Sequence, residues 1–193
     1  MRSDWPVSAL AQLAAMLGNC EARWVVGGST GLALRGAHLD RAPRDLDIYV
    51  DNDTVDLVHE RLQALALDGP VENTTERYYS TLSHYRIDDT MVELVGSFRV
   101  SALECLYITE VNGFLYPNCD KIDLDGHEVP LVPLGHELIF NLLRERQDRA
   151  LVAGKLIAAD PLRHLPLLQR LIGRNAISNT IAEEALRLAS SNS

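Results

Sequence analysis

Lysine is almost absent from this sequence, which has it only at Lys121 and Lys155. The 193 residues carry 18 lysines and arginines against 27 aspartates and glutamates, a formal net charge of −9. A surface this acidic repels phosphate backbones, so duplex nucleic acid is not expected as a partner. Because nearly all of the positive charge is arginine, recognition of an anion would depend on planar guanidinium groups.

Cysteine and long apolar runs are also scarce. Cys20, Cys105 and Cys119 show none of the close-pair spacings of zinc sites or redox dithiols. We therefore expect reduced, mostly buried thiols and a cytoplasmic location. The apolar run Val7–Leu17 is far shorter than the ~20 residues that cross a bilayer, so neither membrane insertion nor secretion is expected.

The sequence contains no internal repeat, and at ~150 residues per domain its length fits one domain with a helical appendage. Apolar residues make up 47% and charged residues 23%, as in soluble globular proteins. We predict an α+β class with a mixed β-sheet flanked by helices. Residues 1–132 form this α+β domain in our interpretation, and residues 133–193 form a helical region packed on it.

Hydrophobic periodicity and turn residues place the elements. The front is predicted to contain, in order, a helix over 4–17, a strand over 23–26, a helix over 29–36 capped by Ser29, a strand over 46–50, a helix over 53–67 capped by Asp53, and a hairpin with strands over 78–87 and 91–95. A tight turn over 123–126, a strand over 128–132 and helices over 137–158, 162–172 and 177–188 complete the chain.

Three carboxylates are the residues most suited to chemistry. Asp45 and Asp47 alternate with apolar residues on one predicted strand, and Glu93 lies between Val92 and Leu94 on a later one. Two residues at i and i+2 of a strand share a face, with Cα atoms ~6.6 Å apart. Carboxylate oxygens are the ligands that Mg²⁺ prefers, and ions of a two-metal site lie ~3.5 to 4 Å apart. Asp45 and Asp47 therefore suit two shared ions, which Glu93 completes if its strand lies alongside.

A glycine turn precedes these carboxylates. Gly27 and Gly28 follow a short β-rich run, and Ser29 opens the next predicted helix. Glycine permits close approach of a phosphate to the backbone, and the first turn of a helix offers unpaired N–H groups. The turn is therefore expected to bind an anion.

Residues 24–29 and 41–48 together resemble the polymerase-beta-like nucleotidyltransferase superfamily, in particular its small lincosamide and aminoglycoside nucleotidyltransferases. The resemblance covers residues 8–96 well and the later part loosely. It implies transfer of a nucleoside monophosphate from an NTP, expected to be ATP, to an acceptor hydroxyl, with release of pyrophosphate. It also implies two Mg²⁺ ions.

The same resemblance implies roles for individual residues. Asp45 and Asp47 would bind both metal ions, and Glu93 would bind one of them and take the acceptor proton. Gly28 with Ser29, after Gly27, would bind the β- and γ-phosphates. Arg44 lies next to the carboxylates, where it would pair either with phosphate or with Asp45.

One position departs from the related enzymes. The first helix of their helical part often carries a lysine, and this chain has Asn141 there. Four cations are candidates to replace it: Arg144, Arg146, Arg149 and Lys155. The absent lysine also motivates a second hypothesis, a non-catalytic or toxin–antitoxin-type interaction module that keeps the fold.

Other site types fit less well. The glycine spacing argues against a dinucleotide fingerprint and a P-loop, and the aspartates over 120–125 fit a hairpin turn better than a calcium loop. No histidines have ligand spacing, although His84 is predicted to lie near the carboxylate strand. Tyr78, Tyr79 and Tyr85 suit packing better than stacking on a ligand.

The sequence leaves the acceptor open, as a small molecule or a protein. Net acidity is compatible with a polycationic acceptor such as an aminoglycoside, and antibiotic modification is a third idea. The preferred base of the NTP and the oligomeric state, including a homodimer, also stay open.

Overall fold

A computed structural model describes residues 6–190. Its strands are β1 (Val25–Gly27), β2 (Asp45–Val50), β3 (Val71–Thr74), β4 (Tyr78–Ile87), β5 (Thr90–Ala102), β6 (Cys105–Ile108), β7 (Asp120–Leu124) and β8 (His127–Leu131). Its α-helices are α1 (Val7–Leu17), α2 (Gly28–Leu34), α3 (Val55–Leu62), α4 (Leu134–Leu143), α5 (Gln147–Ala159), α6 (Pro161–Arg174) and α7 (Asn179–Ser190).

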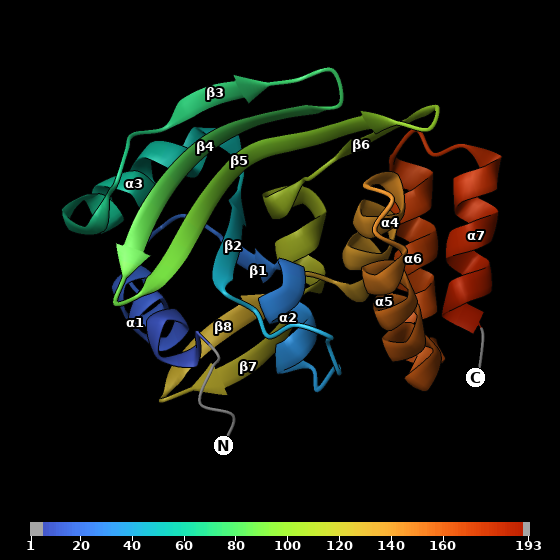
Figure 1. Ribbon diagram of the computed structural model, residues 1–193, viewed down its shortest axis with the longest axis horizontal. Helices are drawn as coiled ribbons and strands as arrows, with labels where there is room; N and C mark the ends of the chain where they lie inside the picture. Colours follow the sequence, from blue (N-terminus) through green and yellow to red (C-terminus); the bar gives the residue numbers. More distant parts are fainter. Residues whose placement is uncertain (1–5, 191–193) are drawn as a thin grey trace.

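The strands form one mixed eight-stranded sheet in the order β3-β4-β5-β2-β1-β8-β7, with β6 paired to β5. β2 runs parallel to β5 and β1 runs parallel to β8, whereas the other pairs are antiparallel. The two parallel pairs lie in the middle of the sheet, and long antiparallel β4 and β5 extend from it (Figure 1). The predicted α+β class with a mixed sheet flanked by helices is confirmed.

Two hydrophobic clusters lie on opposite faces of the central strands. Leu46, Ile48, Val92 and Leu94 pack in one cluster with α1 and α3. The other cluster holds Tyr49 and Val95 with apolar residues of α4 to α7. Figure 1 shows α4 to α7 gathered beside the sheet, away from α1 and α3.

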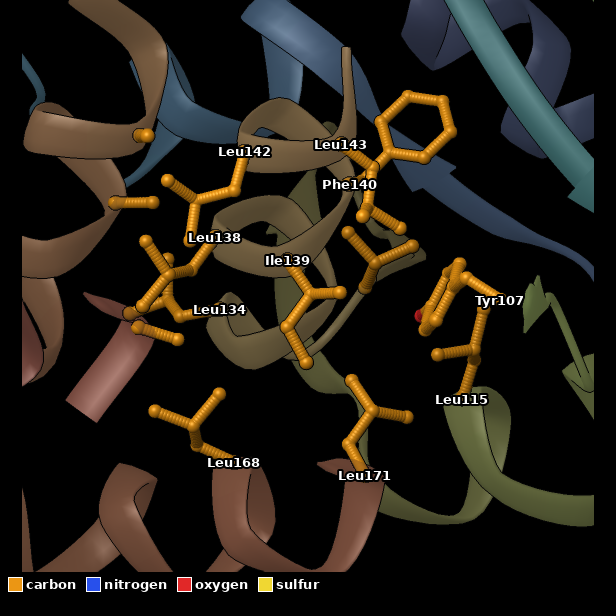
Figure 2. Packing of buried hydrophobic residues seen from close by; sticks show 14 of the residues in the cluster. Tyr107, Leu115, Leu134, Leu138, Ile139, Phe140, Leu142, Leu143, Leu168 and Leu171 are labelled. Carbon is orange, nitrogen blue, oxygen red and sulfur yellow. The ribbon is translucent and has the colours of Figure 1, made fainter. Parts of the chain in front are cut away.

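Helix α4 is the centre of the second cluster. All of its residues are buried, including the polar His136, Glu137 and Asn141. In Figure 2, Leu134, Leu138 and Ile139 lie on the side of α4 nearer to Leu168 and Leu171 of α6, and Tyr107 and Leu115 lie on another side. A helix enclosed in this way has no solvent-facing side on which a polar residue could lie without a partner.

Several helix ends differ from the sequence prediction. Ser29 is not the cap of α2, because the helix begins at Gly28 with Gly27 before it and no side-chain cap. Asp53 is not a cap either, since it lies inside a 3₁₀ turn, Asn52–Thr54, that precedes α3. Helix α3 ends at Leu62 and continues only as a 3₁₀ turn. Asp4, predicted to start the first helix, lies outside the described residues.

The predicted helix over 137–158 is two helices, α4 and α5. The chain leaves α4 at Arg144, and Glu145 adopts a left-handed conformation with φ of 59°. A non-glycine residue in that region interrupts a right-handed helix. The periodicity of the sequence continues across this break, so it did not reveal the turn.

The hairpin prediction is confirmed: β4 has the predicted bounds, and β5 is longer than the predicted strand over 91–95. Strands β3, β6 and β7 were not predicted. The turn predicted over 123–126 connects β7 and β8, with positive φ at Asp125 and Gly126. Over residues 6–190, no helix has the length and apolar character that a membrane span requires.

We predict opposite effects for two glycine-to-alanine changes in the helices. A Cβ at Gly154 in α5 would lie 2.9 Å from the Leu188 carbonyl oxygen of α7, whereas a Cβ at Gly173 in α6 meets nothing within 4 Å. Alanine gains ~1 kcal/mol of helix propensity, but overpacking costs ~1–3 kcal/mol. Urea unfolding should show Gly154→Ala destabilised and Gly173→Ala unchanged or stabilised. Equal effects would contradict the close contact of α5 with α7.

Candidate active site

The pairing of β2 with β5 brings the three predicted carboxylates to one face of the sheet. Asp47 lies directly across from Glu93 in the parallel register, with Leu46 opposite Val92 and Ile48 opposite Leu94. The leucine, isoleucine and valine side chains are fully buried on the α1/α3 face. Because successive side chains alternate, Asp45, Asp47 and Glu93 all point to the other face.

The glycine turn borders the same face. Gly27 of β1 pairs with Asp47, and Gly28 follows with a φ of +67°. A Cβ on Gly28 would lie 2.1 Å from Oδ2 of Asp47. The Thr30 hydroxyl donates to the Asp45 carbonyl at 2.9 Å, which attaches α2 to the start of β2. Only glycine allows the turn to come this close to the carboxylate.

A pocket of about 230 Å³ joins the carboxylates to the glycine turn and to three arginines. It is lined by Gly28, Ser29, Leu32, Asp45, Asp47, Glu93, Glu137, Phe140, Asn141, Arg144, Arg146 and Arg149. The arginines come from the break between α4 and α5 and from the first turn of α5. Of the four cations considered to replace the absent lysine, these three line the pocket, and Lys155 is not among the lining residues.

Arg44 is exposed and does not line this pocket. It precedes Asp45, the first residue of β2, and so lies outside the strand. Within residues 6–190, Arg44 forms no ion pair with Asp45. Gly27 does not line this pocket either, and the side chains of Tyr49 and Glu137 occupy the space next to its Cα.

Asp47 lies in a strongly perturbed electrostatic environment. Burial raises the pKa of Asp47 to about 8, with further increases from Asp45, Glu93 and Glu137 and an opposing effect from Arg144. Two effects thus coincide there, loss of hydration and crowding of negative charge. A bound cation would relieve the second effect directly.

The carboxylates do not form a closed metal-ligating cluster as they stand. No group of three histidine, cysteine, aspartate or glutamate side chains is assembled for an ion anywhere in residues 6–190. The donor set itself consists of oxygens only, as hard divalent cations require.

Glu137 is a fourth carboxylate at the site, and sequence reasoning assigned it no role. It is fully buried in α4, and its Oε1 accepts a hydrogen bond from the Gly28 amide at 2.6 Å. Asn141 donates from Nδ2 to the Glu137 carbonyl at 2.7 Å and to Oε2 at 3.3 Å. Thus Asn141, the residue found in place of lysine, holds the carboxylate that fixes the glycine turn.

A sequence signal for Glu137 does exist, namely a single acidic residue inside an apolar helical run with an asparagine four residues later. Positions i and i+4 lie on one face of a helix. An acidic residue in an otherwise buried helix requires a polar partner. The identity of that partner, the Gly28 amide 109 residues away, comes only from the tertiary structure.

His84 and the tyrosines are also placed. His84 pairs with Glu93 across β4 and β5, and its Nδ1 contacts Asp68 Oδ2 at 2.7 Å. Tyr85 is buried on the opposite face, with its hydroxyl 2.7 Å from Nδ1 of His59. The Tyr79 hydroxyl donates a hydrogen bond to Glu72. Of these three tyrosines, Tyr78 is the one that lines a pocket together with Asp47 and Glu93.

We predict that Glu137 makes the folded protein less stable as the pH rises. Burial raises the pKa of Glu137 from its ordinary value of 4.5 to about 7, despite the bond from Gly28. The folded chain thus keeps a proton that the unfolded chain loses, and stability present below pH 4.5 is lost as the pH rises toward 7. One pKa unit corresponds to about 1.4 kcal/mol.

Chemical denaturation across this pH range should therefore show a shallower loss of stability for Glu137→Gln than for the wild type. Exposed Glu183 supplies the control, because Glu183→Gln should keep the wild-type profile. The comparison between proteins cancels the contributions of other titrating groups. Parallel profiles for wild type and Glu137→Gln would contradict the buried, proton-retaining Glu137.

Comparison with known proteins gives a consistent picture. Residues 9–96 match the profile of the aminoglycoside-2''-adenylyltransferase family, and a search of curated proteins found no match. A Thermotoga maritima protein assigned to the nucleotidyltransferases superposes with a TM-score of 0.61 at 22% identity, covering 75% of this chain and 87% of that one.

Two further solved structures are also similar. ANT(2'')-Ia in complex with adenylyl-2''-tobramycin has a TM-score of 0.50 at 12% identity, covering 87% of this chain and 97% of that one. The lincosamide antibiotic adenylyltransferase LnuA, lincomycin-bound, has a TM-score of 0.50 at 10% identity, covering 80% and 99%. The chain therefore has the nucleotidyltransferase fold and resembles that superfamily, and its residues 9–96 resemble the aminoglycoside-2''-adenylyltransferase family.

Proposed function

We propose that this protein is a nucleotidyltransferase that moves a nucleoside monophosphate from an NTP, expected to be ATP, to a hydroxyl group of a small molecule or a protein, with release of pyrophosphate. The family profile and the structural neighbours support a nucleotidyltransferase enzyme. One observation carries the proposal: Asp47 and Glu93 lie opposite each other, next to Asp45 and the Gly28 turn, in a pocket that also holds three arginines.

Asp45, Asp47 and Glu93 would hold the divalent cations, for which we propose Mg²⁺. Their all-oxygen donor set fits such ions, and a cation would relieve the repulsion that raises the pKa of Asp47. When bound, the ions would neutralise phosphate charge and orient the attacking and leaving oxygens. Asp47 must lose its proton to act as a ligand, so cation binding and proton release are coupled.

The triphosphate would lie against Ser29 and the arginines. Ser29 is in the first turn of α2, where the backbone N–H has no partner within the helix. The Gly28 amide, in contrast, is already bonded to Glu137, so we assign Gly28 the task of giving space beside Asp47. Arg144, Arg146 and Arg149 would supply the positive charge that lysine gives in related enzymes.

Glu93 would take the proton of the acceptor hydroxyl. It lines both the pocket described above and a second pocket on the side of β4. A group that borders both the nucleotide and the acceptor can hold a cation and remove a proton at the point of attack. The non-catalytic alternative was motivated by Asn141 and by the scarcity of lysine, and three arginines bring positive charge to the pocket in spite of both.

Three broader proposals accompany this function. The unpaired cysteines, Cys20, Cys105 and Cys119, suit a reducing cytoplasmic compartment. We retain the division into an α+β domain over 1–132 and a helical region over 133–193, and a homodimer as one oligomeric state to be measured.

Mass spectrometry of products formed from ATP and a panel of hydroxyl-bearing acceptors tests the transfer itself.

We predict that Asp47→Asn weakens the binding of a Mg²⁺ complex of a non-hydrolysable ATP analogue at least tenfold, because it removes a carboxylate ligand. Isothermal titration in buffers of different protonation enthalpy should also show proton release near pH 7 for the wild type, since the pKa of Asp47 is about 8. This release should be reduced in Asp47→Asn. Asp53→Asn, an exposed change in a nearby turn, should bind as the wild type does. Equal affinities of wild type and Asp47→Asn would count against the proposal.

We also predict that Gly28→Ala abolishes nucleotide binding, because its Cβ would lie 2.1 Å from Oδ2 of Asp47. Positive φ alone costs an alanine ~1–2 kcal/mol, so a control for strain is needed. Gly36 has a φ of +80° with nothing within 4 Å, and Gly36→Ala should lose stability but keep nucleotide affinity. Titration and thermal unfolding of both variants separate the two effects. Intact binding by Gly28→Ala would refute the close approach to Asp47.

A further inference from the structure

A second pocket of about 190 Å³ adjoins the carboxylates on the side of β4. It is lined by Asp47, Tyr49, Asn73, Thr75, Tyr78, Ser80, Leu82, Glu93, Val95, Phe98, Phe140 and Arg144. Asp47, Glu93, Phe140 and Arg144 also line the first pocket. The two pockets therefore meet at Asp47 and Glu93, which are proposed to hold the cations, and Glu93 is also proposed to take the acceptor proton. This position suits the second pocket to the acceptor.

Aromatic rings make up much of its wall. Tyr78 and Phe98 stack with ring centroids 6.0 Å apart and an angle of 14° between the planes. Phe140 meets Phe98 edge-on at 5.2 Å. Tyr78 and Phe98 are half-buried, so both retain surface for a ligand. Leu82 and Val95 add aliphatic surface beside them. Flat apolar groups pack favourably on such rings.

The charges of the second pocket do not suit a polycation. Its two carboxylates, Asp47 and Glu93, are the proposed cation ligands, and Arg144 is its third charged side chain. Its remaining polar side chains are neutral. The Arg144 guanidinium lies over the Phe140 ring at 5.0 Å and over the Tyr78 ring at 5.9 Å. The ammonium groups of a polycationic acceptor would be repelled by this guanidinium, and the pocket lining has no carboxylate besides Asp47 and Glu93 to pair with them.

We infer that the acceptor is a hydroxyl-bearing small molecule with a flat apolar or aromatic part and little positive charge, not a polycationic aminoglycoside. This inference rests on the proposed function, because it takes the second pocket as the acceptor site. The net charge of −9 attracts polycations to the protein as a whole, but it does not determine what binds in one pocket. The side chains around the second pocket decide selectivity at short range, where charge pairs act.

Two probes test the inference, neutral 4-nitrophenyl β-glucoside and polycationic tobramycin. Each is titrated against the whole chain by isothermal calorimetry, with and without the Mg²⁺ complex of a non-hydrolysable ATP analogue. The wild type should bind the glucoside at least tenfold more tightly than tobramycin. Tyr78→Ala should weaken glucoside binding roughly 2- to 10-fold, the range of one aromatic pair.

A charge change at the rim gives a test that does not depend on removing a ring. Asn73 is exposed on β3, so Asn73→Asp should fold and should strengthen tobramycin binding several-fold with little change for the glucoside. Thr74→Asp, next to it but outside the pocket lining, is the matched control and should change neither. Thermal unfolding confirms that each variant is folded.

The outcomes separate the two proposals. Tighter binding of tobramycin than of the glucoside by the wild type, no binding of the glucoside, or unchanged affinities in both Tyr78→Ala and Asn73→Asp would overturn the inference about the acceptor. Failure of the Mg²⁺–nucleotide complex to bind would instead overturn the proposed function. Glucoside binding without nucleotide binding would leave the second pocket as a site for flat neutral ligands in a protein with another activity.

Discussion

The parallel register between β2 and β5 is the constraint on which the rest of the site depends. It places Asp47 opposite Glu93 on one face and Leu46, Ile48, Val92 and Leu94 in the core on the other. Because side chains alternate along a strand, a slip of one residue would bury the carboxylates and expose the core. The hydrophobic packing against α1 and α3 thus fixes where the charges converge, at a cost reflected in the raised pKa of Asp47.

Helix α4 and the break after it contribute to the site in two ways. Glu137 of α4 accepts a hydrogen bond from the Gly28 amide, and Asn141 donates one to the Glu137 carboxylate. The conformation of the glycine turn therefore depends on a residue far along the chain. The break after α4 carries the arginines into the pocket. The pocket therefore has carboxylates from the sheet on one side and guanidinium groups from the helices on the other. This distribution of charge suits a metal–triphosphate complex.

Sequence patterns predicted the parts of the site that follow from local alternation. The apolar residues on both sides of Asp47 and Glu93 predicted which side chains of each strand point to the core, and the two glycines predicted the turn. The strand pairing that brings them together was a conditional expectation, and the structure supplies it. Glu137 was missed because its partner lies 109 residues away. The break at Glu145 was missed because a left-handed residue leaves no mark in hydrophobic periodicity. Ser29 and Asp53 failed as caps because each lies one or more residues inside its turn.

A crystal structure of the protein with Mn²⁺ and a non-hydrolysable ATP analogue would test the central claim most directly. Our account predicts anomalous density between Asp45, Asp47 and Glu93, at the ~2.1 Å ligand distances of small divalent cations, with the triphosphate lying toward Ser29 and the arginines of the α4–α5 break. Glu93 turned away from the ion, or ion and nucleotide bound elsewhere with this pocket empty, would contradict it.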